Sequence, residues 1–179
     1  MQNDNSKFKN KSYYNKGVSL LELIIYIAVF SVIALVMIEI FFVSMRGRDL
    51  ANARYEVSSN LRFATEQIRQ TIFDAGVISV SGSCPNNIIN ATSAISSATS
   101  SFFISANALN FSNASGTSAI TTNKVIATTT TPGDCLFAII DNPPPAKSTL
   151  QVKIKMVYNS QGRSDLDISD SRQITVSLR

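Results

Sequence analysis

The feature that most constrains this chain is an almost unbroken apolar run near its start. Residues 18–43 read VSLLELIIYIAVFSVIALVMIEIFFV, with charge only at Glu22 and Glu39. As an α-helix, this run would extend about 39 Å, which exceeds the roughly 30 Å hydrocarbon core of a bilayer. We therefore expect a helix that is long enough to span a membrane.

The positive charge of the chain is concentrated before this run. Residues 1–17 hold four lysines and one aspartate, so +3 of the net charge of +4 lies there and only +1 lies in the remainder. A basic segment directly before an apolar run is the usual cytoplasmic flank of a membrane segment. This position favours a membrane flank over a basic arm that binds nucleic acid. The run is also too long for an ordinary secretory signal peptide.

Beyond residue 43, apolar residues recur at helical spacing. They form one face of an amphipathic helix, made by Leu50, Val57, Leu61, Ala64, Ile68 and Ile72. Arg62 and Glu66 lie off that face, four residues apart, and are spaced to form a weak ion pair. No proline interrupts residues 18–75, and Gly76 is a candidate C-cap. The pattern predicts one helix from about residue 19 to 75.

The remainder of the chain has the pattern of short strands. The strand candidates are 102–104, 108–111, 124–127, 136–140, 150–158 and 173–178. The last two alternate apolar and polar residues, so we expect them to pair as an antiparallel hairpin over the loop 159–170. A sheet with one apolar face needs a cover, and the apolar stripe of the helix is available. The predicted fold class is α+β, with the second half of a long N-terminal helix packed on a small antiparallel β-sheet.

The middle of the chain is polar but uncharged. Ser, Thr and Asn make up about half of residues 90–131, and no charged residue occurs from Ala75 to Asn123. We interpret this composition as surface loops around short strands.

Composition also bears on chemistry. The chain has no histidine, which removes the commonest general base and the commonest metal ligand. No serine stands beside an evident base, so we expect no enzymatic activity, no cofactor and no metal. Only Cys84 and Cys135 are present, which is too few for a cysteine zinc site. In a domain outside the cytoplasm they would form one disulfide, and two free buried thiols are the alternative.

Glu22 carries the functional hypothesis. An ionised carboxylate inside hydrocarbon costs several kcal/mol unless it is paired. Cleavage between Gly17 and Val18 would give Val18 a free α-amino group, whose charge could offset Glu22 on the same chain or on a neighbour shifted by about one helical turn. Such pairing would set the stagger between subunits. A plain single-pass anchor that tolerates one glutamate is the alternative.

The letters around this junction, KGVSLLEL at residues 16–23, resemble the prepilin processing site of type IV pilins and type II secretion pseudopilins. The family pattern has a basic leader, Gly before the cut, an apolar first mature residue, Ser or Thr second and Glu fifth. The resemblance implies cleavage after Gly17 by a prepilin peptidase and then N-methylation of Val18. Two departures are notable. The first mature residue is usually Phe, and many major pilins have a proline in the apolar helix that this chain lacks.

The resemblance also implies how the chain is organised. Residues 1–17 would be the leader, 18–43 the transmembrane and filament-core helix, 44–76 its amphipathic continuation, and 77–179 a β-rich head. The protein would lie in the bacterial inner membrane with its leader in the cytoplasm and its head outside. It would then enter a cell-surface pilus or a periplasmic pseudopilus. Its partners would be other pilin subunits, prepilin peptidase, the inner-membrane assembly platform and, before assembly, membrane lipid.

Three variants of this function follow from the resemblance. The ending 172–179 resembles the last strand of minor pilins and pseudopilins, and the cysteines enclose the middle of the head instead of the C-terminal loop of many major pilins. We therefore favour a minor pilin over a bulk subunit. A type II secretion pseudopilin, or a pilus subunit that binds DNA or a surface, is the alternative.

The basic residues available for DNA are Lys147, Lys153, Lys155, Arg163, Arg172 and Arg179. Neighbouring aspartates at 165, 167 and 170 offset them, so a solvated sheet face is the simpler interpretation.

Overall fold

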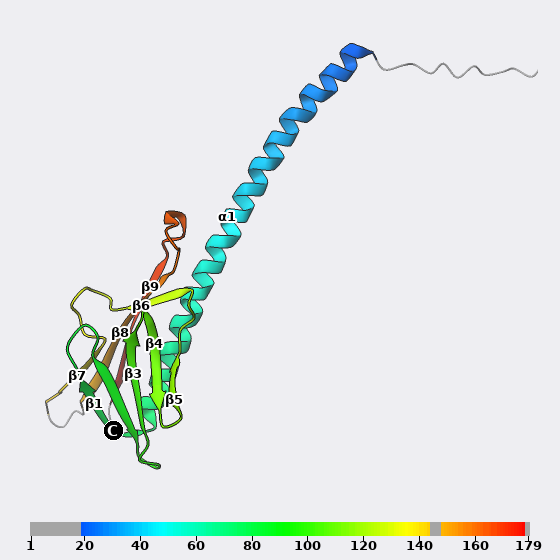
Figure 1. The fold of residues 1–179 in the computed structure, drawn as a ribbon. Helices are drawn as coiled ribbons and strands as arrows, with labels where there is room; N and C mark the ends of the chain where they lie inside the picture. Colours follow the sequence, from blue (N-terminus) through cyan, green and yellow to red (C-terminus); the bar gives the residue numbers. More distant parts are fainter. Residues whose placement is uncertain (1–18, 144–147, 178–179) are drawn as a thin grey trace, which may run out of the picture. The chain divides into compact units, whose positions relative to one another are not determined.

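The computed structural model describes residues 19–143 and 148–177, and the chain divides into two units between Met45 and Arg46. In chain order the described elements are α1 (Leu20–Phe73), β1 (Ala75–Ser81), β2 (Ile88–Ser93), β3 (Thr99–Ser105), β4 (Ala108–Asn113), β5 (Gly116–Ala119), β6 (Val125–Thr128), β7 (Phe137–Ile140), β8 (Thr149–Tyr158), η1 (Ser164–Leu166) and β9 (Ser169–Ser177), as Figure 1 shows. A long helix followed by antiparallel strands confirms the predicted α+β class.

In the first unit, the helix is apolar on every side and uncovered. All its large apolar side chains from Leu20 to Met45 are more than half exposed. By length and composition, α1 is the one helix in the described part of the chain that could cross a membrane. An apolar surface of this size needs lipid or other apolar helices around it.

In the second unit, α1 buries one face. The buried residues are Ala53, Val57, Asn60, Leu61, Ala64, Thr65, Ile68 and Ile72. This confirms the predicted stripe, except that Leu50 is only half-buried. The expected pair of Arg62 with Glu66 is replaced, because Glu66 contacts Arg69 at 3.2 Å instead. Glu66 and Arg69 are both exposed, so their pair adds little to stability.

The helix ends earlier than predicted, and the expected cap at Gly76 is wrong. The last helical residue is Phe73, and β1 begins at Ala75. Gly76 therefore lies inside β1, where the pairing with β2 is irregular. A Cβ on this residue would approach the Cβ of Ala94 to 3.0 Å. The glycine allows two backbones to approach closely, which is another common reason for glycine in a strand.

The strands form two antiparallel sheets where one small sheet was expected. The first has five strands in the order β1-β2-β3-β4-β5, so each strand pairs with the next in the chain. In the second, β8 pairs with β9 on one edge and with β6 and β7 on the other. The predicted hairpin is thus confirmed, although β9 begins at Ser169 and not at residue 173. The ladder simply continues to the pair Val157–Ser169.

One apolar core joins α1 to both sheets. Leu61 and Ile68 of the helix belong to the same buried cluster as Phe102 of the first sheet and Ile154 and Met156 of the second. Burying a side chain of this size contributes about 1.5–3 kcal/mol. The helix therefore stabilises both sheets at once.

Two buried asparagines connect the elements around this core. Asn60 donates to the hydroxyl of Thr122 at 3.3 Å and accepts from its N–H at 2.9 Å, which anchors the segment between the two sheets. Asn87, just before β2, accepts from the N–H of Phe137 at 3.1 Å and donates to its carbonyl. Asn87 thus pairs with β7 as a neighbouring strand would. Because buried polar groups need partners, these amides specify how the sheets join.

Replacing Asn87 with alanine should lower the free energy of unfolding by about 1–3 kcal/mol, because the N–H and carbonyl of Phe137 lose their partner. Denaturant unfolding of the full chain in detergent, followed by near-UV circular dichroism, measures the change. Asn86→Ala is the matched control, since Asn86 is exposed next to it. Equal midpoints for the two variants would contradict the role given to Asn87.

Candidate functional site

The carboxylate of Glu22 has a partner on its own helix. The hydroxyl of Tyr26 donates to Oε1 of Glu22 at 3.0 Å, one turn further along α1. Side chains four residues apart on a helix face each other, so the contact follows from local geometry. Sequence analysis did not single out Tyr26, although a tyrosine at this spacing from an acid was a readable signal. A hydroxyl bonded to a carboxylate reduces the cost of placing that charge in hydrocarbon.

The other polar groups of the apolar segment differ in how they are satisfied. The hydroxyl of Ser31 donates to the carbonyl of Ile27 at 2.7 Å, so it needs no external partner. Glu39, in contrast, makes no hydrogen bond or ion pair with any described residue.

Gly17 and Val18, the predicted cleavage and methylation positions, lie outside the described residues. The pairing of a Val18 amine with Glu22 is therefore still a prediction. The described structure begins at Ser19, whose carbonyl accepts the N–H of Leu23 at 3.1 Å. The backbone just after the predicted cut thus makes the hydrogen bond of an α-helix, from an N–H to the carbonyl four residues earlier.

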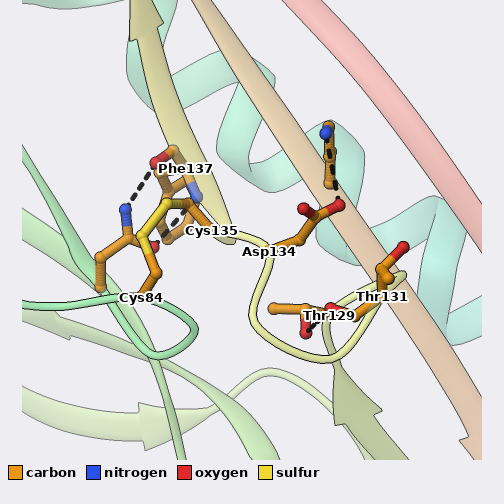
Figure 2. The surroundings of a disulfide bond; sticks show 8 residues. Cys84, Thr129, Thr131, Asp134, Cys135 and Phe137 are labelled. Carbon is orange, nitrogen blue, oxygen red and sulfur yellow. Dashed lines mark hydrogen bonds and ion pairs between the residues drawn. A yellow bond between two sulfur atoms is a disulfide. The ribbon is translucent and has the colours of Figure 1, made fainter.

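The structure joins Cys84 and Cys135 by a disulfide across 51 residues of sequence. Figure 2 shows the bond between the loop that follows β1 and the segment that leads into β7. Asn87 and Phe137 form their amide contact beside it, so a covalent and a hydrogen-bonded link hold the same two segments. The bond therefore ties the first sheet to the second.

Near the disulfide, Asp134 forms an ion pair with Lys153 of β8, and 3.4 Å separates its Oδ2 from the Nζ of Lys153 (Figure 2). Thr129 donates to the carbonyl of Thr131 at 3.0 Å, which closes the turn before Pro132 and Gly133. The carboxylate of Asp134 thus has a structural partner on β8.

Two ion pairs attach loops of the head to α1. Arg163 contacts Asp165 at 2.9 Å and Asp49 of the helix at 3.4 Å, and Lys124 contacts Glu56 at 3.1 Å. The hydrogen bond from Arg163 holds the pKa of Asp165 below its usual value, and the bond to Glu56 raises the pKa of Lys124. These groups are exposed except Glu56, which is half-buried, so the effect of the ion pairs on stability is small. The stabilisation from Asp165 is present at neutral pH and is lost as the pH falls through its lowered pKa.

The residues considered for DNA binding do not form one basic surface among the described residues. Lys153 and Lys155 share one face of β8, but the register of β9 places Arg172 on the other face. Two further members, Lys147 and Arg179, lie outside the described residues. In residues 19–143 and 148–177, no three acidic or cysteine side chains lie together as a metal site would require.

Removing the disulfide should destabilise the head. For a closed loop of this length, the chain-entropy relation gives about 4 kcal/mol, and native disulfides typically contribute about 2–5 kcal/mol. We expect the double variant Cys84→Ser, Cys135→Ser to unfold at lower denaturant concentration than the oxidised chain. A reductant should lower the denaturant midpoint of the parent protein and leave the midpoint of the double variant unchanged. A parent protein that is insensitive to reductant would contradict the expectation.

Comparison with known families matches one segment of the chain. Residues 13–38 fit the family described as the prokaryotic N-terminal methylation motif. The matched segment includes the predicted cleavage junction together with Glu22 and Tyr26. No curated protein and no solved structure matches the chain at a significant level. The motif is the hallmark of the prepilin-type signal, and a long helix followed by antiparallel sheets is typical of pilins. The chain therefore carries the prepilin-type N-terminal segment shared by type IV pilins and pseudopilins.

Proposed function

We propose that this protein is a structural subunit of a type IV pilus-like filament, of the minor-pilin type. One observation carries the proposal. The apolar helix that contains the methylation motif is exposed on all sides, and it carries an acid at the position where the family pattern has Glu. Lipid can cover the apolar surface of such a helix before assembly, and the helices of other subunits can cover it afterwards.

The electrostatics of the segment support a role in assembly. In our proposal, prepilin peptidase removes residues 1–17, and the freed amine of Val18 is methylated and keeps its positive charge. That charge offsets Glu22 of the same chain or of a neighbour. Tyr26 supplies one hydrogen bond to the carboxylate but no charge. A cation remains favourable next to Glu22, so neighbouring helices that meet in the wrong register would leave a charge unpaired.

The other regions receive roles that follow from the proposal. Residues 18–43 anchor the subunit in the bacterial inner membrane and later form the filament core. The rest of α1, to Phe73, continues the helix and covers the sheets, and the strands from β1 onward form the head outside the cytoplasm. Assembly involves an inner-membrane platform and other pilin subunits. The disulfide encloses the middle of the head, which supports a minor subunit over a bulk subunit.

Mass spectrometry of the protein from cells tests the processing step. We expect a mature chain that begins at Val18 and carries one added methyl group, because the junction has the cleavage pattern of the family. Gly17→Leu should block the cut and retain the full leader. A chain that still begins at Met1 inside functional filaments would refute the proposal.

Glu22→Ala should leave membrane insertion intact and reduce incorporation into filaments about tenfold or more, since the pairing energy of a buried charge is several kcal/mol. Tyr26→Phe should cause a smaller loss, and none when added to Glu22→Ala, because its hydroxyl acts only through the carboxylate. Quantitative immunoblots of membrane and sheared-filament fractions measure both. Glu39→Ala is the matched control for loss of an acid in the same segment. Equal losses at the two positions would disprove a specific role of Glu22.

A further inference from the structure

The outer face of the five-stranded sheet is free of charge. The uncharged run from Ala75 to Asn123 contains the whole sheet from β1 to β5. Successive residues of a strand point to opposite faces. Ile89, Phe102 and Leu109 therefore enter the core, and the alternate residues form the outer face. A sheet face of this size without any charged side chain is unusual on a protein surface, where charged residues are common.

A row of small polar side chains crosses this face from edge to edge. The strand register places them opposite one another in the order Ser79, Asn90, Ser101, Ser112 and Thr117. All five are exposed or half-buried. Neighbouring strands lie about 4.8 Å apart, so the row presents a hydroxyl or amide at each such step.

Hydrogen bonds hold this row in place. The hydroxyl of Ser101 donates to Oδ1 of Asn90 at 2.7 Å, and the amide of Asn90 donates to the hydroxyl of Ser81 at 3.2 Å. On the other side, Thr117 donates to Ser112 at 2.9 Å. Hydroxyls both donate and accept, so each retains capacity for a ligand after these bonds. Side chains that are already ordered lose less entropy when a ligand binds.

An aromatic ring lies within the same face. Phe103 is two residues from Ser101 and therefore points the same way, and it is half-buried opposite Asn110 of β4. Ile88 lies on this side too, opposite Ser81. The face thus combines a partly exposed ring with flanking hydroxyl and amide groups. Binding sites for small organic groups have this combination of apolar surface and a few oriented polar groups.

The lack of charge decides which ligands match. Nucleic acids and anionic membranes are bound through lysine and arginine, which this face lacks. Protein interfaces are enriched in Arg, Tyr and Trp and depleted in Ser, the opposite of this row. A ligand built from neutral hydroxyl groups matches both the hydrogen-bonding groups and the absence of charge. Its apolar ring faces would stack on Phe103.

We propose that the outer face of the first sheet binds a neutral polysaccharide. The ligand lies across the strands, with its hydroxyls bonded to the row from Ser79 to Thr117 and one sugar ring on Phe103. This function adds to the filament role and does not rest on it, because the face belongs wholly to the head. A filament subunit with this face would attach its filament to a carbohydrate surface.

The experiment is retention of the full chain, purified in detergent, on insoluble cellulose, chitin and starch. We expect retention on at least one of them, unchanged by high salt because no charges are involved. Ser112→Arg should reduce it about tenfold or more by placing a bulky cation on the face, and Phe103→Leu should reduce it by removing the ring. Ser171→Arg is the matched control, since Ser171 is exposed on β9 of the other sheet.

Three outcomes would overturn the proposal. They are retention on none of the three polysaccharides, equal retention of Ser112→Arg and the parent protein, and preferential retention on DNA or on anionic phosphatidylglycerol vesicles. Circular dichroism of each variant verifies that its head is folded. The filament proposal is tested separately, because Glu22→Ala should bind polysaccharide as the parent protein does.

Discussion

The head of this protein depends on the apolar face of the second half of α1. Val57, Leu61, Ala64 and Ile68 are almost completely buried, and both sheets contribute side chains to the same core. Neither sheet has another described α-helix to cover its apolar face. The helical stripe is therefore the common element through which the two sheets are held together. The disulfide and the side chain of Asn87 then fix one edge of that arrangement.

The tendency of apolar side chains to leave water also governs the first half of the helix, but this unit does not bury its own apolar side chains. There the apolar side chains have nothing from their own unit to pack against, and they remain exposed. Hydrophobic burial is as favourable for this segment as for the core of the head, so it must come from lipid or from other helices. Glu22 makes that environment selective, because a carboxylate in an apolar setting is stable only with suitable partners. Tyr26 is the partner that the described residues provide.

The polar middle of the chain shows why some strands were not predicted. β1, β2 and β5 are built largely from Ser, Thr, Asn, Ala and Gly, residues that are also typical of loops. β2 pairs with β3 and β5 pairs with β4, the strands whose phenylalanines and leucine had the expected pattern, and β1 pairs in turn with β2. The same pairing aligns three serines, one asparagine and one threonine into a row that no local sequence window contains.

Sequence alone determined the parts that rest on local spacing. These are the apolar helix, the amphipathic stripe, the hairpin of β8 and β9, and the motif around Glu22, because periodicity and motif spacing are properties of neighbouring residues. The contact of Glu22 with Tyr26 is local as well, although the sequence pattern did not lead us to predict it. Tertiary structure decided the division into two sheets, the true end of α1, the use of Gly76 in a close backbone approach, and the links made by Asn60 and Asn87. These features depend on contacts between residues far apart in the chain, whose energies no local pattern contains.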